Sequence, residues 1–231
     1  MPSTIGTGPG AAPDSAARAV KLIIATPGSG ALLLAHAAAA GFGLHVRVER
    51  EPQAHAGADS VLVRGLDPFA LVPTDLDPIA TLVLRNPAHW VSALARRHMI
   101  STPEDARRAL DSWRAFALCW IERERALGTP GAACVDDLRL EPHRVLAPLW
   151  AHWGLAYTAR ALDRAIRDRE RWYRLGANRR TRWLNPDRPR CSRLRVAPWA
   201  DVHAVLIEPP FDALAERFEW PTKPKRYGVR E

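Results

Sequence analysis

The feature that most constrains this chain is a short apolar run followed by a glycine-rich turn and a stretch of small and apolar residues. Residues 21–26 read Lys-Leu-Ile-Ile-Ala-Thr, residues 27–30 read Pro-Gly-Ser-Gly, and residues 31–40 contain only Ala, Leu and His. The first run is typical of a buried strand, whereas the third is rich in strong helix formers and is followed by Gly41 and Gly43, which favour a helix end. We therefore predict a strand, a tight turn and a helix.

A turn in this position can bind an anion. The first N–H groups of an α-helix have no partner within the helix, and that end of the helix carries partial positive charge. Backbone N–H groups can therefore hold a phosphate there. The residues do not match GxxxxGK[ST], so the magnesium-dependent triphosphatase motif is not present in this turn. Tight packing of a helix on a sheet accounts for the same glycines.

Strand and helix patterns alternate along the rest of the chain. Short runs typical of strands lie at 44–49, 60–63, 80–84 and 132–135. Helix patterns lie at 89–99 and 103–127, the second beginning with a Thr-Pro start signal at Thr102. The alternation predicts an α/β fold, a three-layer sandwich with a central, mostly parallel sheet of four or five strands flanked by helices.

Length and composition predict one domain, at 19–231, after a disordered arm at 1–18 that has little to bury. No window reaches the roughly 18 unbroken apolar residues of a membrane span, and the 27–30 turn interrupts the apolar core that a secretion signal needs. The three cysteines, which are widely separated, have no zinc-ligand spacing; they are Cys119, Cys134 and Cys191. We therefore expect a reducing, cytoplasmic setting and no structural metal.

A second segment, residues 80–97, contains an arginine where α/β proteins bind ligands. It reads ATLVLRNPAHWVSALARR, so Arg85 directly follows an apolar strand pattern, and Ser92 lies in the helix pattern after Asn86-Pro87. An arginine at the carboxyl edge of a parallel sheet points into the ligand crevice, and its guanidinium matches phosphate oxygens. In the structural alternative, Arg85 pairs with a neighbouring carboxylate and Asn86 only caps the helix.

In this order, PGSGALLL and LVLRNP with a later serine resemble the paired motifs of the sulfotransferases that use 3'-phosphoadenosine 5'-phosphosulfate (PAPS). In that family a Pro-[Lys/Arg]-Ser-Gly-[Ser/Thr]-Thr turn holds the 5'-phosphosulfate, and an Arg-[Asn/Asp]-Pro segment with a later serine holds the 3'-phosphate. Two further stretches are similar to family segments: AACVDDLRLEPHRVLAPLWAHWGL at 132–155 and SVLVRGLDPFALVP at 60–73. The resemblance covers roughly residues 20–155.

The resemblance implies a P-loop nucleoside-triphosphatase-like fold and transfer of a sulfuryl group from PAPS, without a metal, to a hydroxyl or amine of a small-molecule or glycan acceptor. It assigns binding of the 3'-phosphate to Arg85 and Ser92. In the family a late basic loop also closes over that phosphate, and the resemblance assigns this part to Arg179, Arg180 and Arg182. It assigns the 5'-phosphosulfate to the turn, which consists of Pro27, Gly28, Ser29, Gly30, Ala31 and Leu32.

The chain departs from the family pattern at two sites. Gly28 stands where the turn's Lys or Arg neutralises charge on the donor, and Ala31 replaces a hydroxyl residue. At the usual position of a His or Glu base the chain has Arg64-Gly65-Leu66. Asp67 and His55 are therefore the candidate bases, and Arg64 is the candidate that stabilises charge in the transition state.

Three functions remain open: an active PAPS-dependent sulfotransferase, a relative that binds nucleotide without turnover, and an Arg- and Trp-rich protein that binds nucleic acid or an anionic surface. The chain carries 33 Lys and Arg against 25 Asp and Glu, which attracts anions of any of these kinds. The third function depends on residues 171–195, where arginines interleave with tryptophans in a manner suited to base stacking. A solvated basic loop whose Trp172, Trp183 and Trp199 pack on the domain accounts for the same segment.

Overall fold

A computed structural model of the chain describes residues 21–49, 60–67, 80–127, 132–138, 141–177 and 199–220. Several sequence predictions lie outside the described residues: the arm at 1–18, the candidate base His55 and the basic-loop residues Arg179, Arg180 and Arg182. The side chains of Trp172, Trp183 and Trp199 also lie outside what the structure describes.

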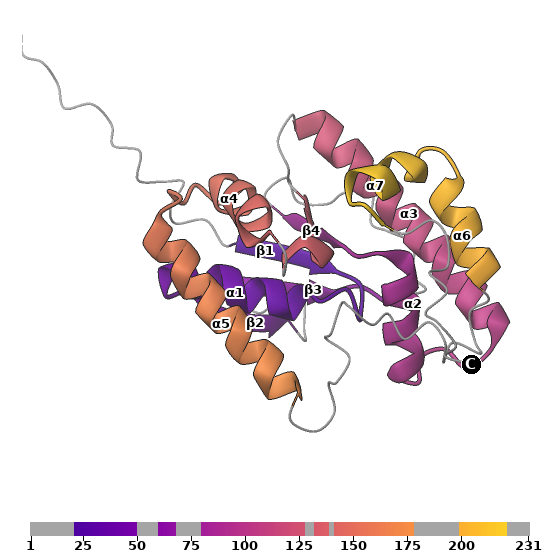
Figure 1. Cartoon of the computed structure of the whole chain (residues 1–231), viewed down its shortest axis with the longest axis horizontal. Coiled ribbons are helices and arrows are strands. Elements are labelled where there is room, and N and C mark those ends of the chain that lie inside the picture. Colours follow the sequence, from indigo (N-terminus) through magenta and orange to yellow (C-terminus); the bar gives the residue numbers. More distant parts are fainter. Residues whose placement is uncertain are drawn as a thin grey trace, which may run out of the picture.

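The described strands form one parallel sheet (Figure 1). Across the sheet they lie in the order β2 (His45–Glu49), β3 (Ser60–Gly65), β1 (Lys21–Ala25), β4 (Thr81–Leu84) and β5 (Ala132–Cys134). Every residue of β1, β4 and β5 is buried, as expected for parallel strands that are covered on both faces. The predicted parallel sheet of four or five strands is therefore confirmed.

Helices cover both faces of the sheet (Figure 1). One face carries α1 (Ala31–Phe42), α4 (Pro142–His152) and α5 (Ala159–Ala177). The other face carries α2 (Pro87–Arg96), α3 (Pro103–Leu127), α6 (Trp199–Ile207) and α7 (Phe211–Arg217). Successive strand residues point to opposite faces, so Ile24 lies in the core beneath α2 and α3, while Ile23 packs beneath α1. The chain is thus an α/β sandwich of helices, sheet and helices.

The helix predicted at 89–99 begins two residues earlier and ends three residues earlier, at Pro87 and Arg96. Asn86 acts as its N-cap, since its side-chain oxygen accepts the N–H of Ala88 at 2.8 Å, and Pro87 occupies the first helical position. The structure therefore confirms the capping role that the sequence suggested for Asn86. Among the described helices, none is both long enough and apolar enough to cross a lipid bilayer.

Small residues let α1 approach its neighbours closely. Ala35, Ala37 and Ala38 are fully buried, and the indole Nε1 of Trp150 in α4 donates to the carbonyl oxygen of Ala38 at 3.1 Å. A Cβ added at Gly41 would lie 2.7 Å from Cζ2 of the same indole. The alanine- and glycine-rich composition of α1 is therefore a packing requirement of this face of the sheet.

We predict that Gly41→Ala lowers the free energy of unfolding by about 1–2 kcal/mol. Overpacking against the buried ring of Trp150 costs about 1–3 kcal/mol, and the better helix propensity of alanine returns less than about 1 kcal/mol. Gly65→Ala is the matched control, because nothing lies within 4 Å of a Cβ there. Urea unfolding measures both variants, and equal stabilities would show that the approach of α1 to Trp150 is not a constraint.

Candidate functional site

The segments singled out in the sequence meet at one edge of the sheet. Because β3, β1 and β4 are parallel neighbours, the residues that follow them lie at the same carboxyl edge. The N–H of Leu66 donates to the carbonyl oxygen of Ala25 at 2.8 Å, which fixes the end of β3 beside the start of the 27–30 turn. From β1 the chain passes to β2 and β3, which lie on one side of β1 within the sheet. It then crosses to β4, which lies on the other side of β1. Open α/β sheets bind ligands at such a switch point.

The 27–30 turn has a conformation that requires glycine. Gly28 and Gly30 have φ angles of 83° and 87°, a region that other residues enter only with strain. A Cβ at Gly28 would lie 3.0 Å from Cβ of Ala93 in α2, and one at Gly30 would lie 3.1 Å from both Cγ atoms of Val135. A Lys or Arg at this position, as in the family turn, would therefore bring its Cβ too close to α2.

The N-terminal end of α1 suits an anion. Its first intrahelical acceptor is Gly30, whose carbonyl oxygen accepts the N–H of Leu34 at 3.2 Å, so the N–H groups of Ala31 and Leu32 have no acceptor within the helix. No acidic residue lies in this first turn to offset the helix dipole. Ser29 is 2 % exposed, and its Oγ has no hydrogen-bond partner among the described residues. A buried hydroxyl in that condition is rare and requires an explanation.

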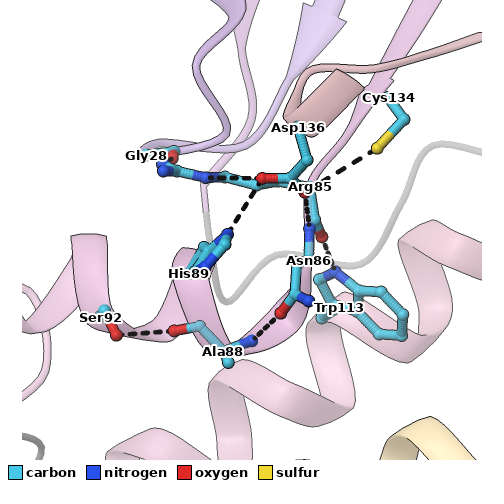
Figure 2. A network of polar contacts seen from close by, with 9 residues as sticks. All are labelled: Gly28, Arg85, Asn86, Ala88, His89, Ser92, Trp113, Cys134 and Asp136. Carbon is cyan, nitrogen blue, oxygen red and sulfur yellow. Dashed lines mark hydrogen bonds and ion pairs between the residues drawn. The ribbon is translucent and has the colours of Figure 1, made fainter. Parts of the chain in front are cut away.

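Two donors from the segment after β4 hold the carbonyl groups of the turn. Nη1 of Arg85 donates to the carbonyl oxygen of Gly28 at 2.7 Å (Figure 2), and Nε1 of Trp90 donates to that of Pro27 at 2.8 Å. The backbone of Arg85 is held in turn, because Nε1 of Trp113 in α3 donates to its carbonyl oxygen at 2.9 Å. The two segments of the resemblance are thus in direct contact, although 57 residues separate Gly28 from Arg85.

Asp136 connects this segment to the end of β5. It begins the 3₁₀ helix η2 (Asp136–Leu138), and its Oδ2 accepts the N–H of Asn86 at 2.5 Å. Its Oδ1 lies 3.1 Å from Nδ1 of His89 and 3.8 Å from Nε of Arg85 (Figure 2). Burial opposes ionisation, but the hydrogen bond and charge of His89, the charge of Arg85 and the N–H of Asn86 hold the pKa of Asp136 below its usual range. The carboxylate is therefore ionised at neutral pH.

The other predicted site residues are placed as follows. Ser92 is buried on α2, and its hydroxyl donates to the carbonyl oxygen of Ala88 at 2.7 Å, so its proton is engaged within the helix (Figure 2). Arg64 is half-buried near the end of β3, and Asp67 is exposed two residues beyond that strand. The roles assigned to Ser92, Arg64 and Asp67 remain predictions.

Comparison with known proteins gives no family. No protein-family model matches the sequence, and no curated protein matches it. The function is therefore inferred from the residues of the site.

The sequence analysis missed three residues of this site: His89, Trp90 and Asp136. Only the stretch at 132–155 gave a signal for any of them, because it contains two aspartates directly after a strand pattern. Among the described residues, no group of three or more His, Cys, Asp or Glu side chains is arranged to hold a metal ion. The site is instead a polar cluster beside a helix N-terminus, with one arginine common to both.

Asp137, beside the cluster, is an acid that keeps its proton to a higher pH in the fold than an aspartate usually does. Burial, followed by the charges of Asp136, Glu141 and Glu219, raises the pKa of Asp137 to about 6 against the opposing charge of Arg144. Between about pH 4 and pH 6, Asp137 therefore retains in the folded chain a proton that it has lost in the unfolded chain, and this group's contribution to stability is lost as the pH rises through that window.

We predict that Asp137→Asn raises the free energy of unfolding at pH 7.5 by on the order of 1 kcal/mol, after allowance for solvent screening, and removes part of the loss of stability between pH 4 and pH 6. Denaturant unfolding across this pH range measures the effect. Asp163→Asn, at an exposed position of α5, is the control. A variant whose stability at pH 7.5 equals that of the wild type would contradict the prediction.

Proposed function

We propose that this protein is a PAPS-dependent sulfotransferase of P-loop-like fold, which binds the donor at the carboxyl edge between β1 and β4. The observation that supports this most is the 2.7 Å contact between Nη1 of Arg85 and the carbonyl oxygen of Gly28. It joins the two segments on which the resemblance depends, at an edge where parallel α/β sheets bind their ligands.

The residues present fit the phosphates of such a donor. The first N–H groups of α1 and the orphaned hydroxyl of Ser29 suit the oxygens of the 5'-phosphate. The guanidinium of Arg85 has five N–H donors, of which one bonds to the carbonyl oxygen of Gly28. Nε is buried beside Asp136, and the remaining donors on Nη1 and Nη2 suit the 3'-phosphate that the resemblance assigns to Arg85.

Transfer requires an acceptor oxygen or nitrogen to attack sulfur in line with the departing phosphate oxygen, while a base removes the acceptor's proton. In this proposal Asp67 or His55 takes that proton. Gly28 contributes no side-chain charge, so Arg64 at the end of β3 offsets the negative charge that develops on the departing phosphate. The acceptor is a small molecule or a glycan.

A second candidate is a protein of this fold that binds the nucleotide without turnover. The observation that favours it is that a Cβ added at Gly28 would lie 3.0 Å from Cβ of Ala93, so α2 leaves little room for the first carbon of the family's cationic side chain. Binding of the nucleotide is common to both candidates, whereas release of the bisphosphate from PAPS in the presence of an acceptor belongs to the first alone.

We predict that Arg85→Ala weakens binding of 3',5'-bisphosphoadenosine about 10- to 100-fold, which corresponds to the loss of one charged phosphate contact. The compound lacks the sulfuryl group, so calorimetric titration tests the site without turnover. AMP and ATP are the ligand controls. Arg97→Ala removes the same charge from the exposed C-cap of α2 and should change affinity less than about twofold.

Two outcomes would oppose this prediction. Wild-type protein that does not bind the bisphosphate contradicts nucleotide binding altogether. A large drop in melting temperature for Arg85→Ala, with no change in affinity of the folded fraction, would show that Arg85 serves only to order the turn.

Ser29→Ala separates a ligand-binding hydroxyl from a structural one. Removing a buried hydroxyl that has no partner leaves the ligand-free protein equally stable or stabilises it by up to about 1 kcal/mol. The same change should weaken binding of the bisphosphate about fivefold if that hydroxyl donates to a phosphate oxygen. Thermal unfolding and calorimetry on one preparation measure both effects, and unchanged affinity would exclude Ser29 from the site.

A further inference from the structure

His89 lies on the face of α2 that packs against the 27–30 turn. Ala93, one helical turn further along, is the side chain nearest to a Cβ at Gly28, and Trp90 donates to the carbonyl oxygen of Pro27. Residues four apart share one face of a helix, so His89 lies on the same face of α2 as Ala93. Figure 2 shows its imidazole beside the guanidinium of Arg85, with Asp136 in contact with both.

The contact with Asp136 orients the imidazole. Nδ1 of His89 lies 3.1 Å from Oδ1 of Asp136, and because that carboxylate is ionised it accepts the Nδ1 proton. Nε2 is therefore the ring nitrogen that remains for a ligand. The side chain is 24 % exposed, so it is accessible to a ligand at this edge.

The charges around His89 come from several elements. Arg85 at the end of β4 is cationic, whereas η2 contributes the ionised Asp136 and, one residue further, Asp137. Cys134 in β5 is neutral, because burial and the two aspartates raise the pKa of its thiol well above the usual value. Arg85 and Asp136 offset one another, so protonation of His89 decides whether this group of three side chains is neutral or carries one positive charge.

We propose that protonated His89 is the second cation of the phosphate site, and that with Arg85 it binds the 3'-phosphate of the nucleotide with uptake of one proton at Nε2. The inference depends on the proposed nucleotide site. It adds, from α2, a second positive charge beside Arg85, and it gives the ligand a hydrogen-bond donor that Ser92 does not offer because its proton is engaged with Ala88. Imidazole is suited to this role because its charge changes within the physiological pH range.

Proton uptake on binding tests the proposal without turnover. Titration of 3',5'-bisphosphoadenosine in two buffers of different ionisation enthalpy at the same pH measures the number of protons taken up per ligand. Since a phosphate monoester itself titrates near pH 6, the quantity of interest is the difference between wild type and His89→Gln. We expect greater proton uptake by the wild type. Its affinity should also rise more than that of the variant between pH 8 and pH 6.5, with a limit of about tenfold per pH unit for one linked proton.

A fixed charge is the matched control. His89→Lys should restore most of the affinity that His89→Gln loses at pH 6.5, but without the additional proton uptake. Both variants change a side chain that is 24 % exposed, and thermal unfolding checks that they are folded. Adenosine 5'-phosphate lacks the 3'-phosphate and should bind with equal proton uptake to wild type and His89→Gln.

Three results would overturn the proposal while nucleotide binding stands: equal proton uptake of the bisphosphate by wild type and His89→Gln, no gain in affinity for His89→Lys over His89→Gln, or the same excess uptake with adenosine 5'-phosphate. Wild-type protein that binds neither nucleotide would contradict the proposed function itself, and with it this inference. The two failures are therefore distinguishable in one set of titrations.

Discussion

The buried carboxylate of Asp136 is the interaction on which the geometry of the site depends. A buried charge is costly unless hydrogen bonds and opposite charges compensate it. Asp136 obtains them from the backbone of Asn86, from His89 and from Arg85, all in the segment after β4. The start of α2 is therefore tied to the end of β5, in an orientation from which Arg85 reaches the carbonyl oxygen of Gly28. Directly, and through Arg85, this carboxylate thus links the segments that follow β5, β4 and β1 at the carboxyl edge of the sheet.

Close packing of α2 on the 27–30 turn determines which charges the site contains. The turn is fixed by left-handed glycines and by donors to two of its carbonyl groups, and it lies so close to α2 that a Cβ at Gly28 would be 3.0 Å from Cβ of Ala93. The packing that orders the backbone N–H groups of the turn therefore leaves little room for a Cβ, and hence for a cationic side chain, at position 28. Any positive charge for a phosphate must come from adjacent segments: Arg64 lies at the end of β3, Arg85 follows β4, and α2 carries His89, the proposed second cation.

The sequence predicted the architecture of the site better than its interactions. The β1–turn–α1 unit and the position of Arg85 follow from local patterns: an apolar run, a glycine turn, and an arginine at a strand end. The partner of Arg85 does not, because Asp136 comes close to it only through the pairing of Leu84 in β4 with Cys134 in β5, a register that no local pattern gives. Ser92 shows the same limit: its position near the start of a helix was evident, but the rotamer that engages its proton with Ala88 was not.

The structural role of Arg85 is compatible with its proposed role in ligand binding. The guanidinium uses one N–H to hold Gly28 and lies 3.8 Å from Asp136 through Nε, so further donors remain for a ligand. A phosphate bound to Arg85 would weaken the attraction between Arg85 and Asp136. The Asp136 carboxylate would then interact more strongly with the imidazole of His89. Under the proposal, a phosphate bound at Arg85 and a proton bound at His89 favour one another, because their charges are opposite. In the proposed site, Asp136 therefore couples the two cations to each other as well as to the fold.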